Sequence, residues 1–331
     1  MRVPIKAKLN QYMKNYLILF IFFIVLTSCD KKNKTEKAIE NIPISIDVDR
    51  FDQAFFETKP EDLQTLKNKY PYFFSSNDDA AWKERMTDPQ WRDLYNEVQK
   101  KYKNFDSESA SIAELLKHIK FYFPETKANP KIITVIGDMD NDMKAIYTDS
   151  LLIVSLELYL GKDHKYYDYP AYIKKNFEAE QIVSDLAQDF AERKIAPPRD
   201  KTLLSQMIYN GKILYLKDLL IPSATDAQKI GYTSEEIVWS EENENYMWRY
   251  FIENKLLFDT SSKLANRFIN PAPFSKFYLE IDNETPGSVG RWIGWQIVRS
   301  YAKNNDVSLE TLLQTDSKEI FDNSKYKPRK E

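Results

Sequence analysis

The chain has 331 residues, of which 43% are hydrophobic and 29% are charged, so its length allows one large domain or two small ones. It contains 7 glycines, 2 histidines and 1 cysteine, and its formal net charge is -3. No GxxxxGK[ST] phosphate loop or GxGxxG dinucleotide turn occurs, which excludes the common glycine-rich phosphate sites. One protomer cannot supply a three-His or Cys/His zinc site, and a single cysteine excludes an intrachain disulfide.

The first thirty residues predict the signal peptide of a lipoprotein. Four basic residues precede an apolar run from Leu17 to Leu26, about half the ~20 residues needed to span a bilayer and typical of a signal-peptide core. The run leads into Leu26-Thr27-Ser28-Cys29, which is similar to a bacterial lipobox, where the cysteine thiol carries the lipid. We therefore expect residues 1–28 to be a signal peptide and Cys29 to carry the membrane anchor, palmitate included.

The rest of the chain divides into a tether, a body and a tail. Residues 29–43 are expected to form the lipidated N-terminus and a charged tether, residues 44–325 a single domain, and residues 326–331 a disordered tail. Cleavage after residue 28 removes four positive charges and no negative one, so the formal charge changes from -3 to about -7. An acidic chain without a basic patch is not suited to binding nucleic acid.

The body begins with strands and continues as helices. Ile44–Asp49 alternates in the manner of a half-buried strand, and Lys131–Ile136 and Ala145–Leu158 are β-rich. Between the last two, residues 137–142 predict a polar hairpin turn rather than a calcium loop, because Met143 stands where an EF-hand requires glycine. Helical patterns cover residues 60–70, 79–102, 109–123, 171–194, 200–220, 225–229, 234–257, 289–303 and 308–313. This order predicts an α+β fold, mostly α, with a small sheet followed by a helical body.

Two local patterns predict how helices begin and pack. Thr233, followed three residues later by Glu236, resembles a capping box at a helix start. Gly290 and Gly294 lie four residues apart on one helical face, where they allow a second backbone to approach closely. A glycine costs a helix up to ~1 kcal/mol relative to alanine, so their presence indicates tight packing of soluble helices.

The mature chain resembles the GldB family of gliding-motility lipoproteins of Bacteroidetes. Six segments carry the resemblance, namely residues 45–51 (SIDVDRF), 157–167 (ELYLGKDHKYY), 214–222 (LYLKDLLIP), 230–233 (IGYT), 270–274 (NPAPF) and 290–298 (GRWIGWQIV). The resemblance covers nearly all of the mature chain, and the lipobox agrees with it.

That family is in turn distantly similar to zincin-type metallopeptidases, in which a small sheet precedes a helix bearing His-Glu-x-x-His. In this chain Ser184-Asp185-Leu186-Ala187-Gln188 would occupy the place of the motif, and Asn210 the place of the third ligand. Zinc chemistry requires imidazoles at the first and last of those five positions and a glutamate to polarise the bound water. Because every ligand position departs from the pattern, the resemblance implies a degenerate zincin-like cleft without a metal or cofactor. An ordinary amphipathic helix with a polar edge is the alternative.

The resemblance implies a lipid-anchored, non-enzymatic cell-envelope protein of the gliding or associated secretion machinery, which acts as a binding or assembly scaffold. It would face the periplasm from either the inner or the outer membrane, and its partners would be envelope proteins. Two alternatives are a metal-dependent peptidase or hydrolase with carboxylate ligands at Asp185, Asp189 and Glu192, and a glycan- or solute-binding lipoprotein rich in Tyr and Trp.

Overall fold

The computed structural model describes residues 34–74, 78–127 and 129–329, and the chain forms two compact units that divide after Ile44. In the first unit, residues 34–40 are helical. Cys29 and the predicted signal peptide lie outside the described residues. None of the helices in the described part of the chain is both long enough and apolar enough to span a bilayer.

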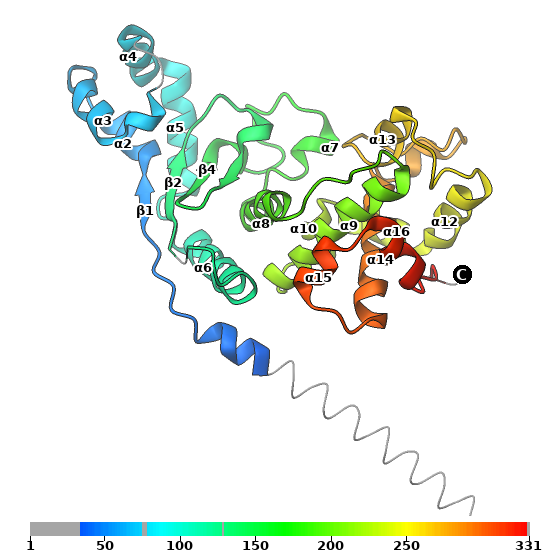
Figure 1. The fold of residues 1–331 in the computed structure, drawn as a ribbon. Coiled ribbons are helices and arrows are strands. Elements are labelled where there is room, and N and C mark those ends of the chain that lie inside the picture. Colours follow the sequence, from blue (N-terminus) through cyan, green and yellow to red (C-terminus); the bar gives the residue numbers. More distant parts are fainter. Residues whose placement is uncertain (1–33, 75–77, 128, 330–331) are drawn as a thin grey trace, which may run out of the picture. The chain divides into compact units, whose positions relative to one another are not determined.

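The second unit contains a four-stranded sheet of order β1-β2-β4-β3, shown in Figure 1. Its strands are β1 (Val48–Arg50), β2 (Lys131–Val135), β3 (Ala145–Tyr147) and β4 (Leu151–Ser155). The first three in sheet order are parallel, and β3 is antiparallel to β4 at the edge. Ile132 and Ile133 are both fully buried although they point to opposite faces, so both faces are covered, as parallel sheets require.

The predicted hairpin at residues 137–142 is wrong. β2 pairs with β4, and β3 pairs with the other edge of β4, so the acidic segment carries the chain across β4 instead of returning it along β2. The hairpin lies between β3 and β4, where the Thr148 amide donates to the Leu151 carbonyl at 2.8 Å. Alternation within a strand shows which residues face the core, but it does not show which strands are neighbours.

The remaining elements are helices, which confirms the α+β, mostly α class. They are α2 (Phe51–Glu57), α3 (Leu63–Lys69), α4 (Asp79–Thr87), α5 (Pro89–Lys101), α6 (Asp106–Tyr122), α7 (Ala171–Lys174), α8 (Gln181–Lys194), α9 (Leu203–Leu220), α10 (Asp226–Ile230), α11 (Ser234–Glu242), α12 (Glu244–Glu253), α13 (Ser262–Phe268), α14 (Val289–Asn304), α15 (Leu309–Gln314) and α16 (Ser317–Asn323).

Three helices predicted as continuous are interrupted. The segment 79–102 breaks at Asp88, whose carboxylate caps α5 by accepting from the Gln90 and Trp91 amides, while Pro89 takes the first helical position. The segments 171–194 and 234–257 are also divided, the second at Asn243. The predicted capping box at Thr233 and Glu236 is confirmed at the start of α11.

Helix α9 packs against α14 more extensively than any other two elements of the described residues pack together. A Cβ added to Gly294 would overlap the carbonyl oxygen of Met207, and one added to Gly211 would overlap the carbonyl oxygen of Gly294. The two backbones are therefore in direct contact, which confirms the close approach predicted at Gly294. Helix α8 lies between this pair and the sheet, because it packs on both α9 and β3.

Candidate functional site

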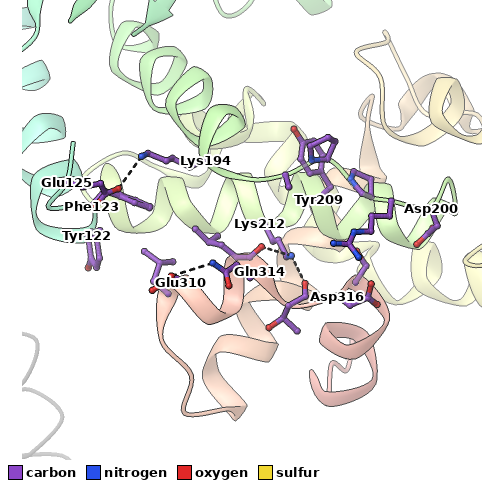
Figure 2. Close-up of a pocket in the computed structure, with 18 of the residues that line it drawn as sticks. Tyr122, Phe123, Glu125, Lys194, Asp200, Tyr209, Lys212, Glu310, Gln314 and Asp316 are labelled. Carbon is purple, nitrogen blue, oxygen red and sulfur yellow. Dashed lines mark hydrogen bonds and ion pairs between the residues drawn. The ribbon is translucent and has the colours of Figure 1, made fainter. Parts of the chain in front are cut away.

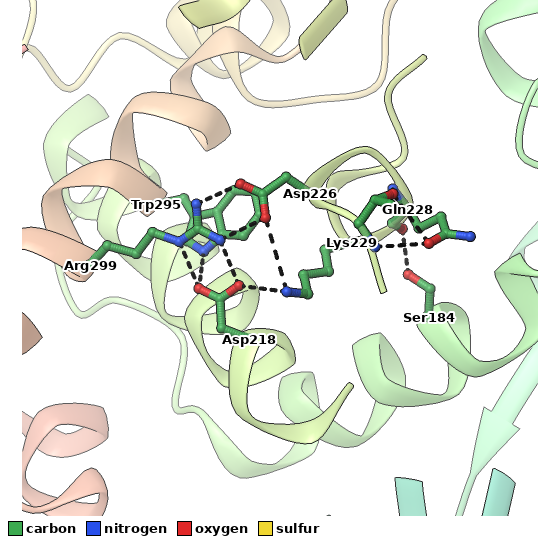
Figure 3. A network of polar contacts seen from close by, with 8 residues as sticks. Ser184, Asp218, Asp226, Gln228, Lys229, Trp295 and Arg299 are labelled. Carbon is green, nitrogen blue, oxygen red and sulfur yellow. Dashed lines mark hydrogen bonds and ion pairs between the residues drawn. The ribbon is translucent and has the colours of Figure 1, made fainter. Parts of the chain in front are cut away.

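The four residues predicted to form the degenerate cleft fall into two groups. Ser184 is buried, and its hydroxyl donates to the carbonyl of Gln228 at 2.6 Å (Figure 3). The amide of Asn210 donates to the carbonyl of Gln206, one turn earlier in α9, at 2.9 Å. Both side chains therefore make local structural hydrogen bonds, whereas Asp185 and Gln188 contact basic side chains.

Asp185 is paired with a lysine at the edge of the sheet. Its Oδ2 lies 3.0 Å from Nζ of Lys144, which directly precedes β3, and accepts a hydrogen bond from the Tyr159 hydroxyl at 2.9 Å. Burial and the Asp185 carboxylate together raise the pKa of Tyr159 well above its ordinary value, so this tyrosine stays a neutral donor. The carboxylate is neutralised by the protein itself.

Lys217, on α9, faces the same polar side of α8 and is only 3% exposed. Its Nζ lies 3.5 Å from Oε1 of Gln188, a long hydrogen bond. Burial, assisted by the positive charges of Arg291 and Lys144, lowers the pKa of Lys217 to about 7, although Asp185 acts in the opposite direction.

Arg291, near the start of α14, is the third basic side chain of this region. Its Nε is buried and has no hydrogen-bond partner among the described residues. Burial lowers the pKa of its guanidinium, and Tyr232 and Glu192 counteract this only in part. We name Lys144, Lys217 and Arg291 the α8 cation cluster, because all three act on the polar face of α8.

The sequence did not single out the α8 cation cluster. Lys217 was detectable in principle, because it lies among Leu214, Leu216 and Leu220, all of which are buried on α9. A lysine in a helical segment that is otherwise apolar indicates a buried cation.

The carboxylates of the alternative hydrolase have separate partners. Asp189 Oδ2 accepts from the backbone amide of Tyr147 at 2.7 Å and from Arg193 at 2.8 Å, and Glu192 accepts from Gln188 at 2.6 Å. Within the described ranges, no three His, Cys, Asp or Glu side chains are grouped so that they could hold a metal ion.

A second polar cluster joins α9, α10 and α14, and we name it the Arg299 network (Figure 3). Arg299 makes two hydrogen bonds of 2.7 Å with Asp218, and two of 2.7 and 2.9 Å with Asp226. Trp295 lies beneath the guanidinium at 3.6 Å and donates to Asp218, and Lys229 lies 3.1 Å from Asp218.

The Arg299 network also shifts the pKa of Asp226. Burial raises this pKa, but the hydrogen bonds and charge of Arg299 outweigh burial, so the pKa lies below its usual value. The network neutralises itself and holds three helices together.

A cleft of about 880 Å³ lies between the end of α6, the segment before α9, and α15 (Figure 2). At its base Lys212 donates to the carbonyls of Leu313 and Thr315 at 2.9 and 2.6 Å, near the C-terminal end of α15. Burial lowers the pKa of Lys212 to about 8. The rim combines aromatic, proline and charged residues, including Tyr122, Phe123, Pro197, Pro198, Arg199 and Tyr209. The glycan- or solute-binding alternative would use this cleft.

The end of the chain contacts α11 and α12. The hydroxyl of Tyr326 donates to Glu244 at 2.8 Å, and Arg329 lies 2.9 Å from Glu241. These residues belong to the segment for which the sequence predicts a disordered tail.

Glu157, in one of the family segments, is fully buried beside the loop that follows β2. Burial raises its pKa to about 7, although nearby backbone amides, among them that of Gly137, and Arg85 favour the charged form. Glu157 therefore keeps its proton in the folded protein up to about pH 7, whereas in the unfolded chain it releases the proton from about pH 4.5. The free energy of unfolding consequently falls as the pH rises from 4.5 to 7, by on the order of 3 kcal/mol. Glu157→Gln is expected to flatten this slope in urea unfolding measured from pH 4.5 to 8.

Glu253→Gln is the matched control for Glu157→Gln, because the Glu253 side chain is 64% exposed. It should retain the wild-type slope. An equal slope in wild type and Glu157→Gln would show that Glu157 does not titrate in this range.

The chain matches the family described as gliding motility protein GldB over residues 32–328. No curated protein and no solved structure matches it. The zincin-like relation therefore stays a prediction. The family match spans almost the whole chain, including the α8 cation cluster and the Arg299 network, and the protein belongs to the gliding motility protein GldB family of lipoproteins.

Proposed function

We propose that the protein is a lipid-anchored, non-enzymatic component of the cell envelope that supports gliding motility as a binding or assembly scaffold. In this proposal Cys29 carries the lipid and the folded unit faces the periplasm. Membership of the GldB family supports the gliding role. The contacts of Asp185 support the non-enzymatic part.

The Lys144–Asp185 ion pair is the observation that carries the non-enzymatic part of this proposal. A zincin carboxylate must be free to act on a metal-bound water, but here an ammonium group lies 3.0 Å from Asp185 Oδ2 and Tyr159 donates to the same atom. The hydroxyl of Ser184, at the first ligand position, is committed to the Gln228 carbonyl. These contacts of Asp185 and Ser184 with side chains and backbone outside α8 support a structural role for the two residues.

Gliding speed tests the proposal in a gliding bacterium whose own copy of the gene has been deleted. Asp185→Asn, Ser184→Ala and Asn210→Ala are each expected to restore gliding to within about two-fold of wild type. Loss of a catalytic acid or base lowers activity by about 10²–10⁴-fold, which separates the two outcomes. Gliding speed is measured by microscopy, with the protein amount in membranes determined by immunoblot.

Cys29→Ala is the reference for lost function in this experiment. It should release the protein from the membrane fraction, remove palmitate labelling and abolish gliding. The non-enzymatic proposal is refuted if Asp185→Asn abolishes gliding while its amount in membranes and its thermal stability equal those of wild type.

A further inference from the structure

We propose that the polar face of α8 and the α8 cation cluster form a binding site for an oxyanion, such as a phosphate or carboxylate group. The site would lie where the sequence predicts a degenerate metal site, but its charge is of the opposite sign. The proposal does not rest on the scaffold function or on the gliding role. It rests on the balance of charge, on unfilled hydrogen-bond donors and on access from solvent.

The balance of charge around α8 is positive. Lys144 and Arg291 both act on Lys217, whereas the nearby carboxylates are Asp185, which is paired with Lys144, and Glu192, whose side chain is exposed. Charges that are shielded from water interact strongly, and an uncompensated buried cation costs several kcal/mol. A bound anion would offset that cost, because it places a negative charge where the protein provides too few.

The donors of this region are unfilled. Within the part of the chain that the structure describes, the three donors of the Lys217 ammonium make one long hydrogen bond, to Gln188, and Nε of Arg291 is buried without an acceptor. Unsatisfied buried donors are rare in folded proteins and cost about 1–3 kcal/mol each. A tetrahedral or carboxylate oxyanion supplies several strong acceptors in a small volume, whereas a neutral or cationic ligand does not.

Gln188 lies against the Lys217 ammonium. Its side chain is half-buried, with Nε2 donating to Glu192 at 2.6 Å and Oε1 facing Lys217. The adjoining side chains of Lys144 and Asp185 are each 18% exposed, so the region reaches the surface beside Gln188. Rotation of the Gln188 side chain would expose the Lys217 ammonium without moving a helix.

Thermal unfolding of the full-length protein in a nonionic detergent tests the site. Inorganic phosphate and acetate are compared with sodium chloride at equal ionic strength, because a ligand that binds only the folded state raises the melting temperature. Phosphate, acetate or both should raise the melting temperature by a few degrees more than chloride. The larger of the two shifts shows whether the site prefers a phosphate or a carboxylate group.

Three variants locate the effect, each compared with its own melting temperature without anion. Lys217→Met and Lys144→Met should lose the anion-dependent shift, and Lys217→Met should melt at or above the wild-type temperature because a buried charge is removed. Lys67→Met, on α3, is the matched control. The Lys67 side chain is 15% exposed and forms an ion pair of 2.8 Å with Asp79, at a different place in the fold. It should keep the full shift.

The result that overturns the proposal is a wild-type shift no larger than that in chloride, or a shift that both Lys217→Met and Lys144→Met retain in full. If Lys217→Met does not fold, the affinity for radiolabelled phosphate is measured by equilibrium dialysis for the wild type and Lys144→Met. Loss of at least ten-fold in affinity for Lys144→Met supports the site, and unchanged affinity refutes it.

Discussion

Gly294→Ala is expected to lower the unfolding free energy by about 3 kcal/mol or more, as measured by urea unfolding. An exchange of glycine for alanine inside a helix normally stabilises it by up to ~1 kcal/mol, so the expected sign is reversed. The reason is that the new methyl group would overlap the Met207 carbonyl oxygen, a backbone atom that cannot turn aside. Relief requires α14 to move away from α9, which would open the core between them.

Two controls accompany Gly294→Ala. Gly290→Ala should cost less, because its Cβ would lie 2.8 Å from the Phe268 carbonyl oxygen and 2.9 Å from the movable Ile269 Cδ1. Lys303→Ala, at an exposed position of the same helix, should change stability by no more than about 0.5 kcal/mol. A neutral or stabilising Gly294→Ala would contradict the direct backbone contact.

Arg299→Met should lower the unfolding free energy by about 3–5 kcal/mol at pH 7, because Lys229 would be the one basic side chain of the described residues left within 4.0 Å of Asp218 and Asp226. Methionine retains most of the side-chain volume over Trp295, so the loss reports on charge and hydrogen bonding rather than on a cavity. Urea unfolding at neutral pH measures the difference.

Arg249→Met is the control for Arg299→Met. Arg249 pairs with Glu253 at 3.4 Å on the surface, where both side chains are more than half exposed. Exposed pairs contribute roughly 0–1 kcal/mol, and we expect a change at the low end of that range. Equal costs for the two variants would show that the Arg299 network is no stronger than an ordinary surface pair.

The sequence predicted the fold class and the helical body but not all the residues at which one helix ends and the next begins. Strand β2 lies within its predicted segment because that segment is rich in β-branched apolar residues, and helix α9 does so because its apolar pattern is long. The break at Asp88 was missed although Asp88-Pro89 is a strong start signal for a helix. Short helices such as α13 and α16 have too few residues to show periodicity, and packing against the rest of the protein determines them.

The sequence predicted a candidate site on the polar face of α8 but did not indicate the basic side chains that the structure brings to it. Of the residues named from the sequence, Asp185 contacts Lys144 and Gln188 contacts Lys217. Lys144 precedes β3, whereas Lys217 lies on α9 and Arg291 on α14, so no local spacing could indicate that all three lie near α8. The same limit applies to Asp226 and Arg299, which are 73 residues apart.

The contact between α9 and α14 determines when the protein can fold during synthesis. Residues 203–220 complete their packing only after residues 289–304 have been made, and Lys212 finds its acceptors at Leu313 and Thr315 later still. Such contacts between distant segments slow folding, because a long loop must close before they form. A chain that ends before Val289 leaves the apolar surface of α9 uncovered and open to proteases. We therefore expect the stable folded state to require residues 289–315 in addition to α9.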